Sequence, residues 1–169
     1  MPSTVIILST LTASYFDVRW RRIPNWLVLL TSLVCLGWHG LVDGYSGILA
    51  SAGGLLLGVV PLFPLFLLRG MGAGDVKYFG AIGAGVTHTH ILTVLVISLG
   101  ISAGMSFYTI VRRRRLRETL SNIFDMLRRF RRAQFKPHPV VAINNENALL
   151  VPFTLASSMA TWLVVFFLA

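Results

Sequence analysis

Charged residues are scarce in this 169-residue sequence, where they make up 12% of the chain against 55% for hydrophobic residues. Soluble domains carry roughly 25% charged and about 45–50% apolar residues. The imbalance excludes an ordinary water-soluble globular protein and predicts a membrane protein. Cysteine is also nearly absent, since Cys35 is the only one. A lone cysteine excludes an internal disulfide and any zinc site built from cysteines.

Acidic residues are scarcer than basic ones, with six Asp and Glu against fifteen Lys and Arg and a net charge of +9. In a soluble chain this excess would suggest nucleic-acid binding. Here the basic residues gather in short blocks between apolar runs, which is typical of cytoplasmic loops. No aromatic stacking platform or fold motif supports nucleic-acid recognition, so we expect no nucleic-acid partner.

The apolar runs predict an all-α fold, a polytopic membrane helix bundle that forms a single membrane-embedded domain over residues 1–169. One span needs about 20 residues to cross ~30 Å of hydrocarbon. A glycine-rich segment before Thr87-His88-Thr89-His90 favours a break at that point. The first run lacks basic residues in front of it, which favours a membrane helix over a cleaved signal peptide. We expect six transmembrane helices, at about 2–18, 24–42, 47–68, 75–88, 90–111 and 148–168.

The basic residues predict the orientation of this bundle. An even number of spans places both termini on the same side of the membrane. With both termini outside, the inner segments are 17–23, 69–77 and 112–147, and these contain all fifteen Lys and Arg residues. Because cytoplasmic loops carry the excess of Lys and Arg, we expect both termini outside.

Residues 112–147 form a basic cytoplasmic insert before the last predicted span. Apolar residues within 112–136 fall on one helical face with arginines around them. This pattern predicts an amphipathic helix on the cytoplasmic face of the membrane, lying against anionic lipids. Residues 136–147 are expected to be a linker.

Small residues recur at four-residue spacing in three of the predicted spans. Such pairs let the backbones of neighbouring membrane helices approach closely. We therefore expect tight helix packing at three pairs: Gly54 and Gly58, Ala81 and Gly85, and Gly100 and Gly104.

Two acidic residues stand out because carboxylates in or beside a membrane span are costly. Asp17 closes the first apolar run, and its simplest interpretation is a solvated carboxylate paired with Arg21. Asp75 follows the glycine-rich Gly72-Ala73-Gly74 and opens the fourth span. Its simplest interpretation is a carboxylate that satisfies the free amides of a helix N-terminus. Asp43, by contrast, lies in a turn sequence that explains it.

The predicted topology places Asp17 and Asp75 at the same membrane face. Two carboxyl groups brought close together cannot both ionise easily and share a proton over part of the pH range. One can then take a proton from water while the other donates to a carbonyl oxygen. The sequence alone leaves open whether these two residues meet.

At these two positions the chain resembles the type IV prepilin peptidases, members of the GxGD class of membrane aspartyl proteases. One stretch that carries the resemblance is Asp17-Val18-Arg19-Trp20-Arg21-Arg22-Ile23-Pro24-Asn25. The other is Gly72-Ala73-Gly74-Asp75-Val76-Lys77. The lone cysteine rules out the zinc-binding domain of the larger members, which also methylate their product. The chain therefore looks most like the small branch that serves Flp-type (tight adherence) pili.

The resemblance implies an aspartic endopeptidase of the bacterial inner (cytoplasmic) membrane. Its substrates would be pilin-like precursors, cleaved at the cytoplasmic face after a short basic leader peptide. By this resemblance Asp17 and Asp75 are the catalytic carboxylates, and Gly72 and Gly74 let the loop fold beside the scissile bond. Lys77 would tune the local field or hold substrate, or it is simply an inner-face cation. No cofactor and no metal are expected.

Two other classes of function stay open at this point. A proton-coupled transport subunit could use Asp17 and Asp75 as a relay, although spans 24–42 and 47–68 offer no charged group at mid-depth. A non-catalytic assembly protein of a pilus or secretion system could keep the same fold. A metal site at His39, His88 and His90 has only weak support from the His-x-His spacing.

Overall fold

The computed structural model describes residues 2–20, 22–67, 71–112 and 153–167. Over these residues the only regular secondary structure is helical, which confirms the all-α expectation. The helices are α1 (Ser3–Trp20), α2 (Asn25–Val59), α3 (Phe63–Leu67), α4 (Ala73–Arg112) and α6 (Phe153–Phe167). The expected amphipathic helix and linker of the 112–147 insert lie outside the described residues, apart from Arg112 at the end of α4.

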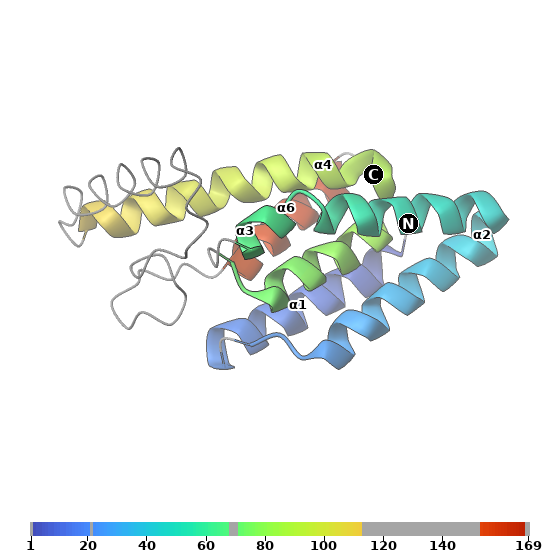
Figure 1. Ribbon diagram of the computed structural model, residues 1–169, viewed down its shortest axis with the longest axis horizontal. Coiled ribbons are helices and arrows are strands. Elements are labelled where there is room, and N and C mark those ends of the chain that lie inside the picture. The colour runs from blue at the N-terminus through green and yellow to red at the C-terminus, as the bar shows by residue number, and fades with distance from the viewer. Residues whose placement is uncertain (1, 21, 68–70, 113–152, 168–169) are drawn as a thin grey trace.

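The two longest helices each fold back on themselves, as Figure 1 shows. In α2 the helix breaks at Gly44, whose φ of 62° suits a residue without a Cβ. In α4 it breaks at Thr87, with φ 63° and ψ 178°. The backbone therefore confirms both predicted breaks, one between 24–42 and 47–68 and one between 75–88 and 90–111. Thr87 is β-branched, and a β-branched residue rarely adopts a positive φ because its Cβ clashes with the backbone, whereas glycine adopts it freely.

The predicted span 47–68 is not one continuous helix, because α2 ends at Val59 and a separate short helix, α3, begins at Phe63. Pro61 lies between them. Proline has no backbone N–H and its ring clashes with the carbonyl of the preceding helical turn, so the α-helix cannot continue through it.

The core lies where the second half of α2 crosses the first half of α4. A Cβ at Gly54 would lie 2.1 Å from the carbonyl oxygen of Gly83, and a Cβ at Gly58 would lie 2.8 Å from that of Phe79. The predicted close approach at Gly54 and Gly58 is therefore confirmed. Only residues without a Cβ allow two helix backbones to come this near.

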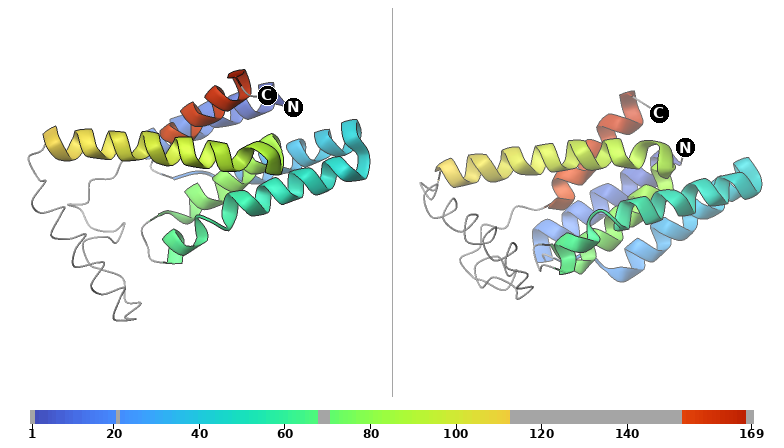
Figure 2. Two further views of the ribbon diagram at one scale, coloured as in Figure 1. Left: turned by 90° about the horizontal axis from the view of Figure 1, so that it is seen from above. Right: turned by 45° about the horizontal axis from the view of Figure 1, so that its top comes forward.

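The other glycine pairs behave differently from one another. Gly85 packs tightly, because a Cβ there would lie 2.7 Å from Ile6 and 3.1 Å from the Cys35 sulfur. Gly100 and Gly104 have nothing within 4 Å of the space where a Cβ would be. Among the described residues the expected helix contact at this third pair is not found, because the later part of α4 extends past the other described helices (Figure 2).

The ends of the bundle differ in character. The start of α1, the end of α6 and the two reversals lie toward one end, as the views in Figures 1 and 2 agree. The end of α1 and the starts of α2, α4 and α6 lie toward the other. The basic residues that the structure describes belong to this second end: Arg19, Arg22, Lys77 and Arg112.

The outer surface of the helices is strongly apolar. Two segments, Asn25–Leu67 and Ala73–Arg112, are long and apolar enough to cross a membrane, and Phe153–Phe167 is a shorter apolar helix. Exposed apolar side chains on this scale are not found on soluble monomers. They include Leu29, Leu33, Leu41, Leu92, Val96 and Phe166. These features indicate a membrane protein, while the six-span count and the orientation of the termini stay predictions.

Candidate active site

Asp17 lies in the last turn of α1 and is partly buried. A carboxylate at this position faces the negative end of its own helix dipole, so α1 gives it no electrostatic support. Its partner comes from α6, where the hydroxyl of Thr154 donates a hydrogen bond to Oδ2 of Asp17. Thr154 is 1% exposed and lies in the first turn of α6. Asp17 therefore faces the N-terminus of another helix, which favours negative charge.

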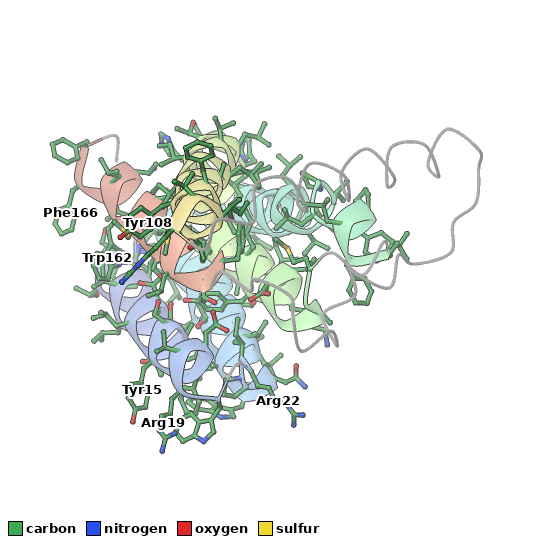
Figure 3. The ribbon with its side chains drawn as sticks, turned by 90° about the vertical axis from the view of Figure 1, so that its left-hand side faces the viewer. Tyr15, Arg19, Arg22, Tyr108, Trp162 and Phe166 are labelled. Carbon is green, nitrogen blue, oxygen red and sulfur yellow. The ribbon has the colours of Figure 1, made fainter. Side chains whose placement is uncertain are left out.

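Further hydrogen bonds fix how α6 lies along α1. One turn beyond Thr154, the hydroxyls of Ser158 and Ser14 are 2.8 Å apart. One turn further, Nε1 of Trp162 donates to Oγ1 of Thr10 over 2.9 Å. We call these three contacts, at Thr154, Ser158 and Trp162, the α1–α6 ladder. Figure 3 shows Trp162 where the two helices run side by side.

Asp75 opens α4, three residues after Gly72. Its carboxylate accepts a hydrogen bond from the backbone N–H of Gly72, and the N–H of Val76 donates to the Gly72 carbonyl over 3.3 Å. This is one half of a capping box, in which the side chain of the third helical residue accepts from the backbone N–H at the N-cap, because Gly72 has no side chain to make the reciprocal bond. Asp75 therefore acts in part as a helix-capping carboxylate, as the sequence predicted.

Asp75 also has partners outside its own helix. Its carboxyl group lies within hydrogen-bonding reach of the Thr154 side chain and within electrostatic reach of Asp17. The start of α6 is held over α4 by Phe153, whose ring centroid lies 5.9 Å from that of Phe79, one turn after Asp75. The structure thus places Asp75 near enough to Asp17 and Thr154 to interact with both, while the hydroxyl of Thr154 hydrogen-bonds Asp17.

The two sequence stretches that contain these aspartates also touch each other. A Cβ at Gly74 would lie 3.5 Å from the Cβ of Ile23 and 3.7 Å from its backbone nitrogen. A Cβ at Gly72 would lie 3.2 Å from Oδ2 of Asp75, a closer approach than a side chain normally makes. Gly72 therefore makes room for the Asp75 carboxylate, whereas a Cβ at Gly74 would make only an ordinary contact with Ile23.

Among the residues that the structure describes, no Lys or Arg forms an ion pair with Asp17 or Asp75. The one close acid–base contact among the described residues joins His39 and Asp43, at the opposite end of the bundle. Arg19 and Arg22 project away from the helices at the periphery (Figure 3). Arg21, the partner considered for Asp17, lies outside the described residues. Lys77 is exposed and two residues from Asp75, a spacing that places side chains on different helix faces.

Aromatic side chains surround the end of α1 near Asp17. The Phe16 ring centroid lies 5.1 Å from that of Trp20 and 6.3 Å from that of Trp26, and Tyr15 lies 5.8 Å from Trp20. Tryptophan and tyrosine concentrate where a membrane meets water. This cluster indicates that Asp17 lies at the depth of that interface.

A family model described as the type IV leader peptidase family matches residues 4–107 of the chain. The chain belongs to the type IV leader peptidase family. This is a family of proteases, and the resemblance inferred from the two sequence stretches is confirmed at that level. The match includes Asp17 and Asp75 and ends before α6. No curated protein and no solved structure matches the chain significantly.

Sequence reasoning missed Thr154, which lies outside the family match. The available signal was a run of hydroxyl residues in an otherwise apolar helix, at 154, 157, 158 and 161. The weak metal hypothesis gains no support from the structure. Among the described residues no group of three His, Cys, Asp or Glu side chains could hold a metal ion, and the buried His39 instead places Nε2 3.1 Å from the carbonyl oxygen of Gly85.

Proposed function

We propose that this protein is an aspartic leader peptidase that removes the short basic leader from pilin-like precursors at the cytoplasmic face of the bacterial inner membrane. The observation that carries the proposal is the closeness of Asp75 to Asp17 and Thr154. The family supports proteolysis, and two adjacent carboxyl groups supply an acid and a base without a covalent nucleophile.

The reaction follows from one proton shared between two carboxyl groups. The ionised carboxylate takes a proton from a water molecule while the oxygen of that water attacks the carbonyl carbon of the leader peptide bond. The protonated carboxyl gives its proton to the carbonyl oxygen, which forms a neutral tetrahedral diol. The C–N bond then breaks as the first carboxyl gives the proton that came from the water to the leaving nitrogen. At the same time the second carboxylate takes a proton from one hydroxyl of the diol, which leaves the product carboxylic acid. The carboxyl pair returns to its starting state, with no acyl-enzyme.

The position of the pair at one end of the bundle suits a substrate that stays in the membrane. Asp17 lies beside the aromatic cluster formed by Tyr15, Phe16, Trp20 and Trp26, whose residue types are typical of the membrane interface. A precursor whose apolar segment remains in the bilayer would therefore present its leader at this depth. With both termini outside and six spans, this end faces the cytoplasm, and anionic lipids lie against the basic residues there.

The alternative of proton-coupled transport gains little from the described residues. The polar groups of the α1–α6 ladder beyond Asp17 are hydroxyls and an indole, and none of them titrates near neutral pH. Several of these hydroxyls donate to backbone carbonyls, as Ser158 does to those of Thr154 and Thr10. Only an assay of precursor cleavage can distinguish the protease from a non-catalytic assembly protein.

The test is cleavage of a pilin precursor from the same organism by the protein in membranes. Wild type is compared at matched expression with Asp17→Asn, Asp75→Asn and the control Asp43→Asn. Asp43 has the same charge and a side chain that is 56% exposed, but it lies at the opposite end of the bundle. We expect each active-site substitution to lower the rate by about 100-fold or more, and the control to cleave like wild type.

Each departure from this result has its own meaning. Cleavage at the wild-type rate by Asp17→Asn or Asp75→Asn would reject the carboxyl pair as the catalytic unit. Absence of cleavage by the folded wild-type protein across several pilin precursors would favour the assembly role. Loss of cleavage in Asp43→Asn as well would show that the assay follows folding and not chemistry.

A further inference from the structure

The geometry points to Thr154 as a positioning residue whose hydroxyl donates to Asp17, holds it in its reactive orientation and links it to the neighbouring Asp75. This inference rests on the proposed protease function and extends it to a helix outside the family match. Thr154 acts through Asp17 and Asp75. It is therefore distinct from the groups that exchange protons with water and substrate.

The hydroxyl of Thr154 differs from those of Ser157 and Thr161 on the same helix. Ser157 donates to the carbonyl oxygen of Thr154 over 2.9 Å, and Thr161 donates to that of Ser157 over 2.6 Å. These bonds stay within the helix, which is how hydroxyls are usually satisfied there. Thr154 instead donates across the helix interface to a carboxylate. The Thr154 hydroxyl therefore bonds to the carboxylate of Asp17, while the Thr154 backbone carbonyl accepts a hydrogen bond within α6.

Three separate contacts determine where this hydroxyl lies. The pair of Ser158 and Ser14 and the bond from Trp162 to Thr10 align α6 on α1, four and eight residues after Thr154. The ring contact of Phe153 with Phe79 aligns the same end of α6 on α4. Thr154 is thereby fixed against the helix of each aspartate. Such support from packed neighbours is what holds a reactive group in a single geometry.

The chemistry of a hydroxyl suits a site with one shared proton. A threonine hydroxyl has one proton to donate and lone pairs that accept. It can donate to the ionised carboxylate of Asp17 while accepting from Asp75 when that group carries the proton. A carboxylate and a carboxylic acid are thus both satisfied by one side chain. Valine has the same shape but neither function, and serine has both functions without the methyl group.

The experiment compares Thr154→Val, Thr154→Ser and Thr161→Val with wild type, using purified protein and a pilin precursor. Thr161 is a matched control because it is fully buried on the same helix and its hydroxyl bond is local. We expect Thr154→Val to lower kcat by about tenfold or more with little change in KM. Thr154→Ser should retain most of the wild-type kcat, and Thr161→Val should leave kcat unchanged.

A second measurement does not depend on substrate. The carboxyl C=O stretching band in the infrared spectrum is assigned by its loss in Asp17→Asn and Asp75→Asn. It is then compared in the threonine variants. We expect the band to shift in Thr154→Val and to stay in place in Thr154→Ser and Thr161→Val. A purely structural role of Thr154 would change thermal stability without this pattern.

The outcomes separate this inference from the proposed function. Cleavage by wild type together with a normal kcat in Thr154→Val overturns the role of Thr154 and leaves the protease intact. Equal losses of kcat in Thr154→Val and Thr161→Val also overturn it, because the effect is then structural. If wild type cleaves nothing, the proposed function fails, and the infrared band decides the link through Thr154: an unshifted band in Thr154→Val rejects it and a shifted band supports it.

Discussion

Gly54 of α2 and Gly83 of α4 touch through their backbones. A Cβ at Gly54 would lie 2.1 Å from the Gly83 carbonyl oxygen, and a Cβ at Gly83 would lie 2.2 Å from that of Gly54. The contact is reciprocal and has no side chain that could move aside. The start of α4, which carries Asp75, therefore has its place in the bundle set by two residues without side chains.

Gly54→Ala is expected to lower the free energy of unfolding by about 2–3 kcal/mol, because the added methyl group must separate two helix backbones. Gly100→Ala is the control, since it adds the same group where nothing lies within 4 Å. Thermal unfolding in the same detergent measures both. Equal unfolding temperatures for the two variants would contradict the close helix crossing.

Gly72→Ala and Gly74→Ala are expected to differ in activity. The alanine Cβ at residue 72 would lie 3.2 Å from the Asp75 carboxylate, while the one at residue 74 would make an ordinary 3.5 Å contact with Ile23. Gly72→Ala should lower kcat by about tenfold through displacement of the carboxylate, and Gly74→Ala should stay near wild type. Measured kcat for precursor cleavage decides between them. A greater loss at residue 74 would show that contact with Ile23 matters more.

Thr87→Gly is expected to stabilise the protein by about 1 kcal/mol. Thr87 has a φ of 63° and a ψ of 178°, a combination that costs residues with a Cβ about 1–3 kcal/mol and glycine very little. The gain is reduced by the greater freedom of glycine in the unfolded chain. Thr89→Gly is the control, because helical backbone at that residue should make glycine destabilising by about 0.3 kcal/mol relative to threonine. Opposite shifts in unfolding temperature are the expected result, and a parallel decrease in both variants would count against the break at Thr87.

The α1–α6 ladder can be measured as a coupling energy. In a double-mutant cycle of Trp162→Phe and Thr10→Val, the indole N–H and its acceptor are removed singly and together. Hydrogen bonds between membrane helices give coupling energies of about 0.6 kcal/mol on average. Unfolding free energies of the four proteins in the cycle provide the measurement. Strictly additive losses would mean that this bond contributes nothing to the alignment of α6.

Local patterns in the sequence predicted much of this architecture. Apolar runs predicted helices, the Asp43-Gly44 turn and the glycine-rich approach to Thr87 predicted the reversals, and unusual acids beside apolar runs identified Asp17 and Asp75. Each depends on residues close together in the chain. Pro61 is also a local signal for a helix break. Because apolar residues lie on both sides of it, hydropathy alone predicts one uninterrupted span there.

What the sequence could not supply was the choice of neighbours. Gly54 and Gly100 have the same small-residue spacing, yet only Gly54 meets another helix. Thr154 and Thr161 are both hydroxyl residues on one apolar helix, yet only Thr154 reaches a carboxylate. These differences arise from which helices pack together, and this is decided by contacts between residues far apart in the chain, such as Asp17 and Thr154, which are 137 positions apart.

The place of α6 in the order of the chain has a consequence for the timing of synthesis. Asp17 and Asp75 leave the ribosome well before Thr154, and the family-matched segment ends at residue 107. A nascent chain can therefore hold both carboxylates in the bilayer while the hydroxyl between them has yet to be made. If Thr154 orients the pair, the enzyme gains full activity only once α6 has been inserted beside α1, and unfinished chains do not cleave precursors prematurely.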